Sequence, residues 1–177
     1  MINKVLIATD GSEHARKAVE FGSDIAAKYG AEVVLVHVLL RNELSESLRH
    51  VAEVEHIAAE GGQPLSKAIA SVPFARFPAN IIYSDESATT PDQVLRAVGE
   101  HVLSQAEQLA REHGVGKIAR RIEDGNPVKR ILETVEAEHV DLVVSGARGL
   151  SDLASLLVGS VSHKLSYLSP VTCITVR

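Results

Sequence analysis

Two glycines and a glycine-serine pair in the last third of the chain have the spacing of a phosphate-binding loop. The sequence reads Gly146-Ala-Arg-Gly149 and, after nine further residues, continues with Gly159-Ser160. Glycine lets the backbone approach an anion closely, and the unpaired amides at a helix N-terminus attract negative charge. The lysine-bearing pattern of P-loop nucleotide hydrolases is absent. These residues therefore predict a phosphate cradle of another kind.

A candidate carboxylate follows the first apolar run of the chain. Asp10 comes directly after the run Lys4–Thr9, and a second apolar run, Val140–Ser145, precedes the glycine loop. If the two runs are neighbouring parallel strands, Asp10 faces the glycine loop across a crevice at the carboxyl edge of the sheet. A carboxylate there can accept a ribose hydroxyl or help to hold a metal that bridges phosphates. The alternative is that Asp10 only caps the first helix, with Glu13 as its capping-box partner.

Apolar runs alternate with helical patterns along the chain, which is typical of a parallel sheet with crossover helices. Gly30 and Gly114 are expected to end the first two helices, and Thr90 and Asn126 to begin the second and third. The last helix is predicted over 159–168, with Val161, Leu165 and Leu168 pointing inward. The five predicted strands are Lys4–Thr9, Ala31–Leu39, Lys117–Ile122, Val140–Ser145 and Val171–Val176.

The stretch 41–89 does not fit this alternation and is interpreted as an insertion after the second strand. Its first half has helical spacing, the remainder is irregular, and long insertions in compact domains are usually functional or mobile. His50, Glu53 and His56 lie on one broad side of the helical half. A metal site is one interpretation of these three residues, and a solvated helix face is the other.

Composition limits the class of protein. A chain of 177 residues with 45% hydrophobic residues favours one α/β domain. The net charge of −5 and the absence of a basic run argue against a nucleic-acid partner. No secretory signal or bilayer-spanning run is visible, so we expect a cytoplasmic protein without membrane insertion. The single Cys173 excludes an intrachain disulfide.

The chain resembles the universal stress protein family. The glycine pattern Gly146-x-x-Gly149, nine residues, Gly159-Ser160 is similar to that family's nucleotide-binding signature. Further similar segments are Lys4-Val-Leu-Ile-Ala-Thr-Asp10-Gly-Ser12, Glu32-Val-Val-Leu-Val-His-Val38, Gly125-Asn-Pro127 and Ser169-Pro-Val-Thr-Cys-Ile-Thr-Val-Arg177. The resemblance covers the whole chain except the insertion at 41–89, and it implies a single domain over 1–177.

The resemblance implies a fold and an assembly. The fold is the adenine nucleotide alpha hydrolase-like one, an open five-stranded parallel sheet in the order 3-2-1-4-5 with helices on both faces. The assembly is a homodimer formed through the last strand, Val171–Val176, whose free backbone groups suit pairing with a partner.

The resemblance also implies a ligand, which is ATP, AMP or ADP with Mg or Mn at the phosphates. No protein metal ligand is assigned beyond Asp10 as a candidate. The adenine lies against the end of the second strand and the ribose meets the turn after the first strand and the glycine loop. The implied binding residues are Thr9, Asp10, His37, Val38, Gly146, Arg148, Gly149, Gly159, Ser160, Val161 and Ser162.

No residue is placed to activate water, so no catalytic residue is assigned. The leading hypothesis is an ATP-binding regulatory module of the stress response, read by an unknown protein partner. The alternatives are a slow ATPase, an autophosphorylating protein with Ser160 or Ser162 as acceptor, and a nucleotide-free dimeric scaffold.

Overall fold

The computed structural model of the protein describes residues 1–39, 91–149 and 159–177. The insertion at 41–89, with His50, Glu53 and His56, and the predicted N-cap Thr90 lie outside the described residues. The described residues 1–39, 99–149 and 159–177 belong to one compact unit. The described elements are β1 Lys4–Ala8, α1 Glu13–Tyr29, β2 Glu32–Leu39, α5 Pro91–Glu112, β3 Ile118–Asp124, α6 Pro127–Ala137, β4 Leu142–Gly146, α7 Ser160–Leu168 and β5 Thr172–Val176.

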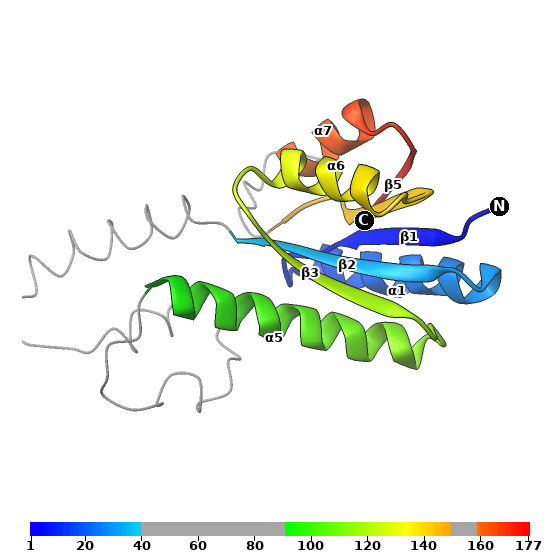
Figure 1. Ribbon diagram of the computed structural model, residues 1–177, viewed down its shortest axis with the longest axis horizontal. Helices are drawn as coiled ribbons and strands as arrows, with labels where there is room; N and C mark the ends of the chain where they lie inside the picture. Colours follow the sequence, from blue (N-terminus) through cyan, green and yellow to red (C-terminus); the bar gives the residue numbers. More distant parts are fainter. Residues whose placement is uncertain (40–90, 150–158) are drawn as a thin grey trace, which may run out of the picture. The chain divides into compact units, whose positions relative to one another are not determined.

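The five strands form one parallel sheet in the order β3-β2-β1-β4-β5, as predicted. Successive side chains of β1 point to opposite faces, and both faces are covered. Val5 and Ile7 pack in a core with α1 and α5, whereas Leu6 packs in a second core with α6 and α7. Figure 1 shows the two pairs of helices on opposite sides of the sheet.

Local capping signals set several element ends. Gly30 ends α1 in the left-handed conformation with φ 65°, and Asn126 caps α6 by accepting a hydrogen bond from Lys129 N at 3.1 Å. Some strand ends were predicted less accurately: β4 is Leu142–Gly146 rather than Val140–Ser145. β3 runs to Asp124 rather than Ile122, because it pairs with β2 as far as Leu39.

Leu168 was predicted to point inward, and this is wrong. Its exposed fraction is 51%, whereas Leu165 is fully buried in the core beneath α7. Leu168 is the last residue of α7 and lines a shallow groove between α6 and α7 with Leu132 and Lys164. Leu168 has the spacing from Leu165 that is typical of an apolar stripe, but its side chain faces this groove and is exposed.

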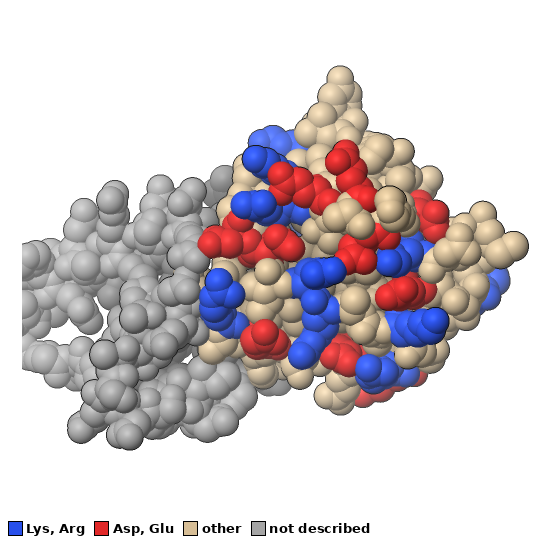
Figure 2. Space-filling model, viewed as in Figure 1, with Lys and Arg blue, Asp and Glu red and all other residues tan. Residues whose placement is uncertain are grey.

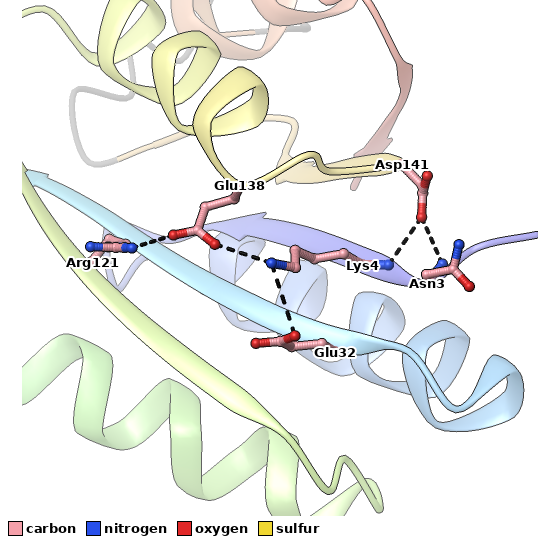
Figure 3. A network of polar contacts seen from close by, with 6 residues as sticks. All are labelled: Asn3, Lys4, Glu32, Arg121, Glu138 and Asp141. Atoms are coloured by element: carbon pink, nitrogen blue, oxygen red, sulfur yellow. Dashed lines mark hydrogen bonds and ion pairs between the residues drawn. The ribbon is translucent and has the colours of Figure 1, made fainter.

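Glu138 connects the end of α6 to β1 and β3 (Figure 3). Its carboxylate pairs with Arg121 of β3 and accepts a hydrogen bond from Lys4 Nζ of β1 at 3.1 Å. The same Lys4 Nζ lies 3.9 Å from Glu32 Oε2 at the start of β2. The two hydrogen bonds lower the pKa of Glu138.

Asp141 ties the start of β1 to the start of β4. Its Oδ2 accepts hydrogen bonds from the backbone amides of Asn3 at 2.7 Å and Lys4 at 3.1 Å. These bonds favour the charged form and lower the pKa of Asp141. The polar contacts of Figure 3 therefore hold the amino edge of the sheet together.

This edge is expected to make the protein acid-sensitive. A carboxyl whose pKa is lowered on folding contributes stability in full above its ordinary pKa, 4.5 for Glu138 and 3.8 for Asp141, and loses it as pH falls through the lowered value. Glu138→Gln should lower the free energy of unfolding by about 0.5 to 1 kcal/mol at neutral pH and flatten the acid dependence. Urea unfolding between neutral and acid pH measures both effects. Glu136→Gln, an exposed position in the last turn of α6, is the control. An unchanged acid dependence in Glu138→Gln would contradict the assignment.

Candidate functional site

The turns after β1 and β4 leave the sheet side by side. The two strands are adjacent and parallel, with Ala8 opposite Ser145 at their carboxyl ends. The helix after β1, α1, packs on one face of the sheet, and α7, the next of the described helices after β4, packs on the other. Such a switch point opens a crevice at the carboxyl edge of an open α/β sheet. The structure therefore brings the Asp10 turn and the glycine loop together, as the sequence predicted.

The turn after β1 is held by its own polar groups. Thr9 is buried, its amide donates to Val36 O at 2.9 Å, and its Oγ1 accepts from Gly11 N at 3.3 Å. Asp10 Oδ1 accepts a hydrogen bond from Ser12 N at 2.9 Å. Thr9 and Asp10 thus have fixed positions at the mouth of the crevice.

Asp10 does not cap α1, so the predicted capping box with Glu13 is wrong. The N-cap is Ser12, whose Oγ accepts a hydrogen bond from Ala15 N at 3.2 Å. The same hydroxyl lies 3.5 Å from Arg148 O and connects the start of α1 to the glycine loop. Ser12 was missed as a site residue, although a serine directly before the first helical residue is an N-cap signal.

Gly149 faces Asp10 across the crevice. A Cβ added at Gly149 would lie 2.5 Å from Asp10 Oδ2, so no side chain fits there while the carboxylate keeps its place. Gly149 therefore lets the backbone of the loop reach the carboxylate.

Gly146 is required for a different contact. A Cβ at Gly146 would lie 2.7 Å from the carbonyl carbon of His14 and 2.8 Å from Ala15 N, in the first turn of α1. Since these are backbone atoms, they cannot move without shifting the helix. Gly146 therefore allows the close approach of α1 to the end of β4.

The N-terminus of α7 closes the other side of the site. Gly159 is the N-cap, with no side-chain hydrogen bond to the first turn, and its amide donates to Ala147 O at 2.6 Å. The first amides of a helix have no intrahelical acceptor and favour an anion nearby. Ala147 acts through its backbone alone, and for that reason no sequence signal identified it.

The predicted site residues on α7 differ in accessibility. Ser160 is exposed and Val161 is half-buried, whereas Ser162 is 3% exposed and its Oγ donates to Ala147 O at 2.9 Å. Ser162 therefore fastens α7 to the loop after β4, and Ser160 is the accessible hydroxyl.

His37 and Val38 lie near the end of β2, with their side chains on opposite faces of the sheet. His37 is 6% exposed, and its Nδ1 lies 3.0 Å from Thr9 O. Burial lowers the pKa of His37, so the neutral ring is favoured. Val38 is also buried and belongs to the core on the α6 side. Because strand neighbours alternate, only one of these two side chains lies on any one side of the sheet.

One buried polar group at the crevice has no partner. Ser145 is 4% exposed, and its Oγ has no hydrogen-bond partner within the described residues. A buried hydroxyl is normally paired, so the Oγ of Ser145 lacks a polar contact within the described residues. The described ranges contain no group of three His, Cys, Asp or Glu side chains that could hold a metal.

The surface around the fold carries both signs of charge. On the face seen in Figure 2, Lys and Arg side chains alternate with Asp and Glu, and neither sign forms a continuous patch on the described part. Within that part, no helix combines the length and the apolar character that crossing a bilayer requires. The cytoplasmic placement remains a prediction.

Comparisons with known proteins agree with the fold. A family model described as "Universal stress protein family" matches residues 1–177. The universal stress protein YxiE of Bacillus subtilis is 29% identical over 179 residues, covering 100% of both chains.

Solved structures with a similar fold are also universal stress proteins, at lower sequence identity to this chain. A universal stress protein in complex with cAMP matches with a TM-score of 0.61 and 22% identity, covering 99% of this chain and 97% of that one. The universal stress protein of Archaeoglobus fulgidus in complex with dAMP matches with a TM-score of 0.57 and 16% identity, covering 100% and 98%.

Proposed function

The chain belongs to the universal stress protein family, and on that premise we propose that it is a regulatory module of the stress response that binds ATP. The observation that carries the proposal is the close approach of Gly149 and Asp10. Because Gly149 has no side chain, its backbone lies near the Asp10 carboxylate. Two solved relatives of this fold bind the adenine nucleotides cAMP and dAMP. We extend adenine-nucleotide binding to this chain and specify ATP.

We assign each part of the nucleotide to groups around the crevice. Asp10 can accept the ribose hydroxyls, because its carboxylate is held at the mouth of the crevice by Ser12 N. The phosphates suit the amides at the start of α7 and the guanidinium of Arg148. The adenine suits the end of β2, which lies beside the Thr9 turn. Mg or Mn would supply charge neutralisation at the phosphates, with Asp10 as the candidate protein ligand.

We propose that the protein forms a homodimer through β5. This strand is an edge of the sheet, paired with β4 alone among the described strands, and its residues are half-buried or exposed. An edge strand with free amides and carbonyls is a template for pairing with a second copy. The insertion at 41–89 follows β2, and we propose that it acts as a lid or as the surface for the protein partner.

A slow phosphoryl transfer is the alternative function. The exposed hydroxyl of Ser160 at the N-terminus of α7 is the observation that favours it, because an acceptor must be accessible to the γ-phosphate. Ser162 is the weaker acceptor, since its hydroxyl is buried and donates to Ala147 O. The sequence offers no obvious base to activate water, and we therefore favour binding over turnover.

Mass spectrometry of the purified protein incubated with ATP and Mg tests these proposals together. Under native conditions we expect a dimer that carries intact ATP, and under denaturing conditions an unmodified chain. Bound ADP with released phosphate, or a covalent phosphate that is lost in Ser160→Ala and kept in Ser166→Ala, would establish the alternative. A protein that takes up no nucleotide would refute the proposed function, and a monomer at all concentrations would refute the dimer.

A further inference from the structure

His37 links three elements that meet behind the Asp10 turn. Its ring is 6% exposed at the end of β2, and its Nδ1 lies 3.0 Å from Thr9 O, which follows β1. On the side of α5, the ring edge at Cδ2 lies 3.0 Å from the position that a Cβ of Gly99 would take. The ring therefore touches the turn that carries Asp10 and the helix that follows the insertion.

The contact with Thr9 fixes which nitrogen carries the proton. A carbonyl oxygen only accepts hydrogen bonds, so Nδ1 of His37 must be the donor. Burial lowers the pKa of the ring, which leaves Nε2 without a proton in the neutral form. The ring is thus oriented by one directional bond to the turn.

Gly99 of α5 leaves room for the His37 ring. Glycine is among the least favourable residues in a helix interior, and Gly99 lies well inside α5. The space it leaves is bounded by His37 Cδ2 at 3.0 Å and Leu39 Cδ2 at 3.3 Å from the Cβ position. Alanine, the best helix former, would push against the ring.

We propose that His37 is a positioning residue for the nucleotide site: it holds the Thr9 carbonyl, and through it keeps the Asp10 carboxylate opposite Gly149. Gly99 of α5 leaves the space that the ring needs. A side chain at Gly99 would therefore shift the ring, and with it the nucleotide site. The inference rests on the proposed nucleotide binding, but it assigns His37 to the protein framework rather than to the adenine.

Two substitutions of His37 distinguish positioning of the Thr9 turn from direct contact with the adenine. His37→Asn keeps an N–H donor close to the place of Nδ1, whereas His37→Phe keeps an aromatic ring and loses the donor. Positioning predicts that ATP affinity stays within about threefold of wild type in the first variant and falls at least about tenfold in the second, because Thr9 O loses its partner. The opposite order, with phenylalanine retaining affinity and asparagine losing it, would show direct stacking on adenine and overturn the inference.

A second measurement does not depend on ATP. In the nucleotide-free protein, the backbone amide signals of Gly11 and Ser12 should shift strongly in His37→Phe and little in His37→Asn. If wild type binds no ATP, the proposed function fails while these shifts still decide whether His37 positions the turn. Amide signals that are equally unchanged in both variants would overturn the inference.

Gly99→Ala tests the connection to α5. We expect the same amide shifts and an affinity loss of about threefold to tenfold. The midpoint of thermal unfolding reports the balance between the higher helix propensity of alanine and the strain of the added methyl group. Gly116→Ala is the matched control, since a Cβ there meets nothing within 4 Å. Affinity and amide signals that are the same in the two glycine variants would remove α5 from the proposal.

Discussion

Gly149→Val is expected to abolish ATP binding and to leave the fold intact. The added Cβ would lie 2.5 Å from Asp10 Oδ2, and the valine methyl groups would extend further into the crevice. The carboxylate can rotate away at small cost to the fold, but it then leaves the place where it meets the ribose. Losing a charge-assisted hydrogen bond costs about 1.5 to 3 kcal/mol. With the blocked crevice added, affinity should fall by about 100-fold or more.

Isothermal titration with ATP measures this loss, and thermal unfolding checks the fold. Gly116→Val is the control, because the same side chain there enters open space. Wild-type affinity in Gly149→Val would refute the assignment of the crevice as the nucleotide site. Equal losses of affinity in both variants would show a general effect of the substitution.

Gly146→Ala is expected to destabilise the fold itself. The new methyl group would lie 2.7 Å from the carbonyl carbon of His14 and 2.8 Å from Ala15 N. Both atoms belong to the backbone at the start of α1, so the helix or the end of β4 must shift. Overpacking of this kind costs about 2 to 3 kcal/mol.

Urea unfolding measures the effect as a lower midpoint with an unchanged slope. Gly116→Ala is the matched control and should change the free energy of unfolding by less than about 0.5 kcal/mol. A midpoint for Gly146→Ala equal to that of wild type would contradict the close approach of α1. Substitutions at the two glycines of one motif are therefore expected to have different effects. Gly149→Val loses the ligand, whereas Gly146→Ala loses stability.

The sequence by itself predicted the five strands, because continuous apolar runs such as that of β2 are buried on both faces of a parallel sheet. It also predicted the helix ends at Gly30 and Asn126, because a cap depends on the local backbone and one short side chain. The strand order was implied by the family resemblance and is confirmed.

Other features were decided by the tertiary structure alone. Ser12 rather than Asp10 caps α1: both residue types are good caps, and the choice depends on where the helix begins, which the structure places at Glu13. Leu168 has the spacing of an inward residue but is exposed, because it lines the open groove between α6 and α7. Ser162 is buried and Ser160 is not, because α7 turns the former toward Ala147 O.

The different roles of Gly146 and Gly149 also depend on tertiary contacts. Spacing along the chain predicted that both glycines belong to one loop, since glycine permits the turn. What each glycine approaches is set by the pairing of β1 with β4, strands that are far apart in sequence, and by the packing of α1 against them. Local patterns reflect local backbone energies, whereas contacts between distant segments exist only once the sheet has brought their ends together.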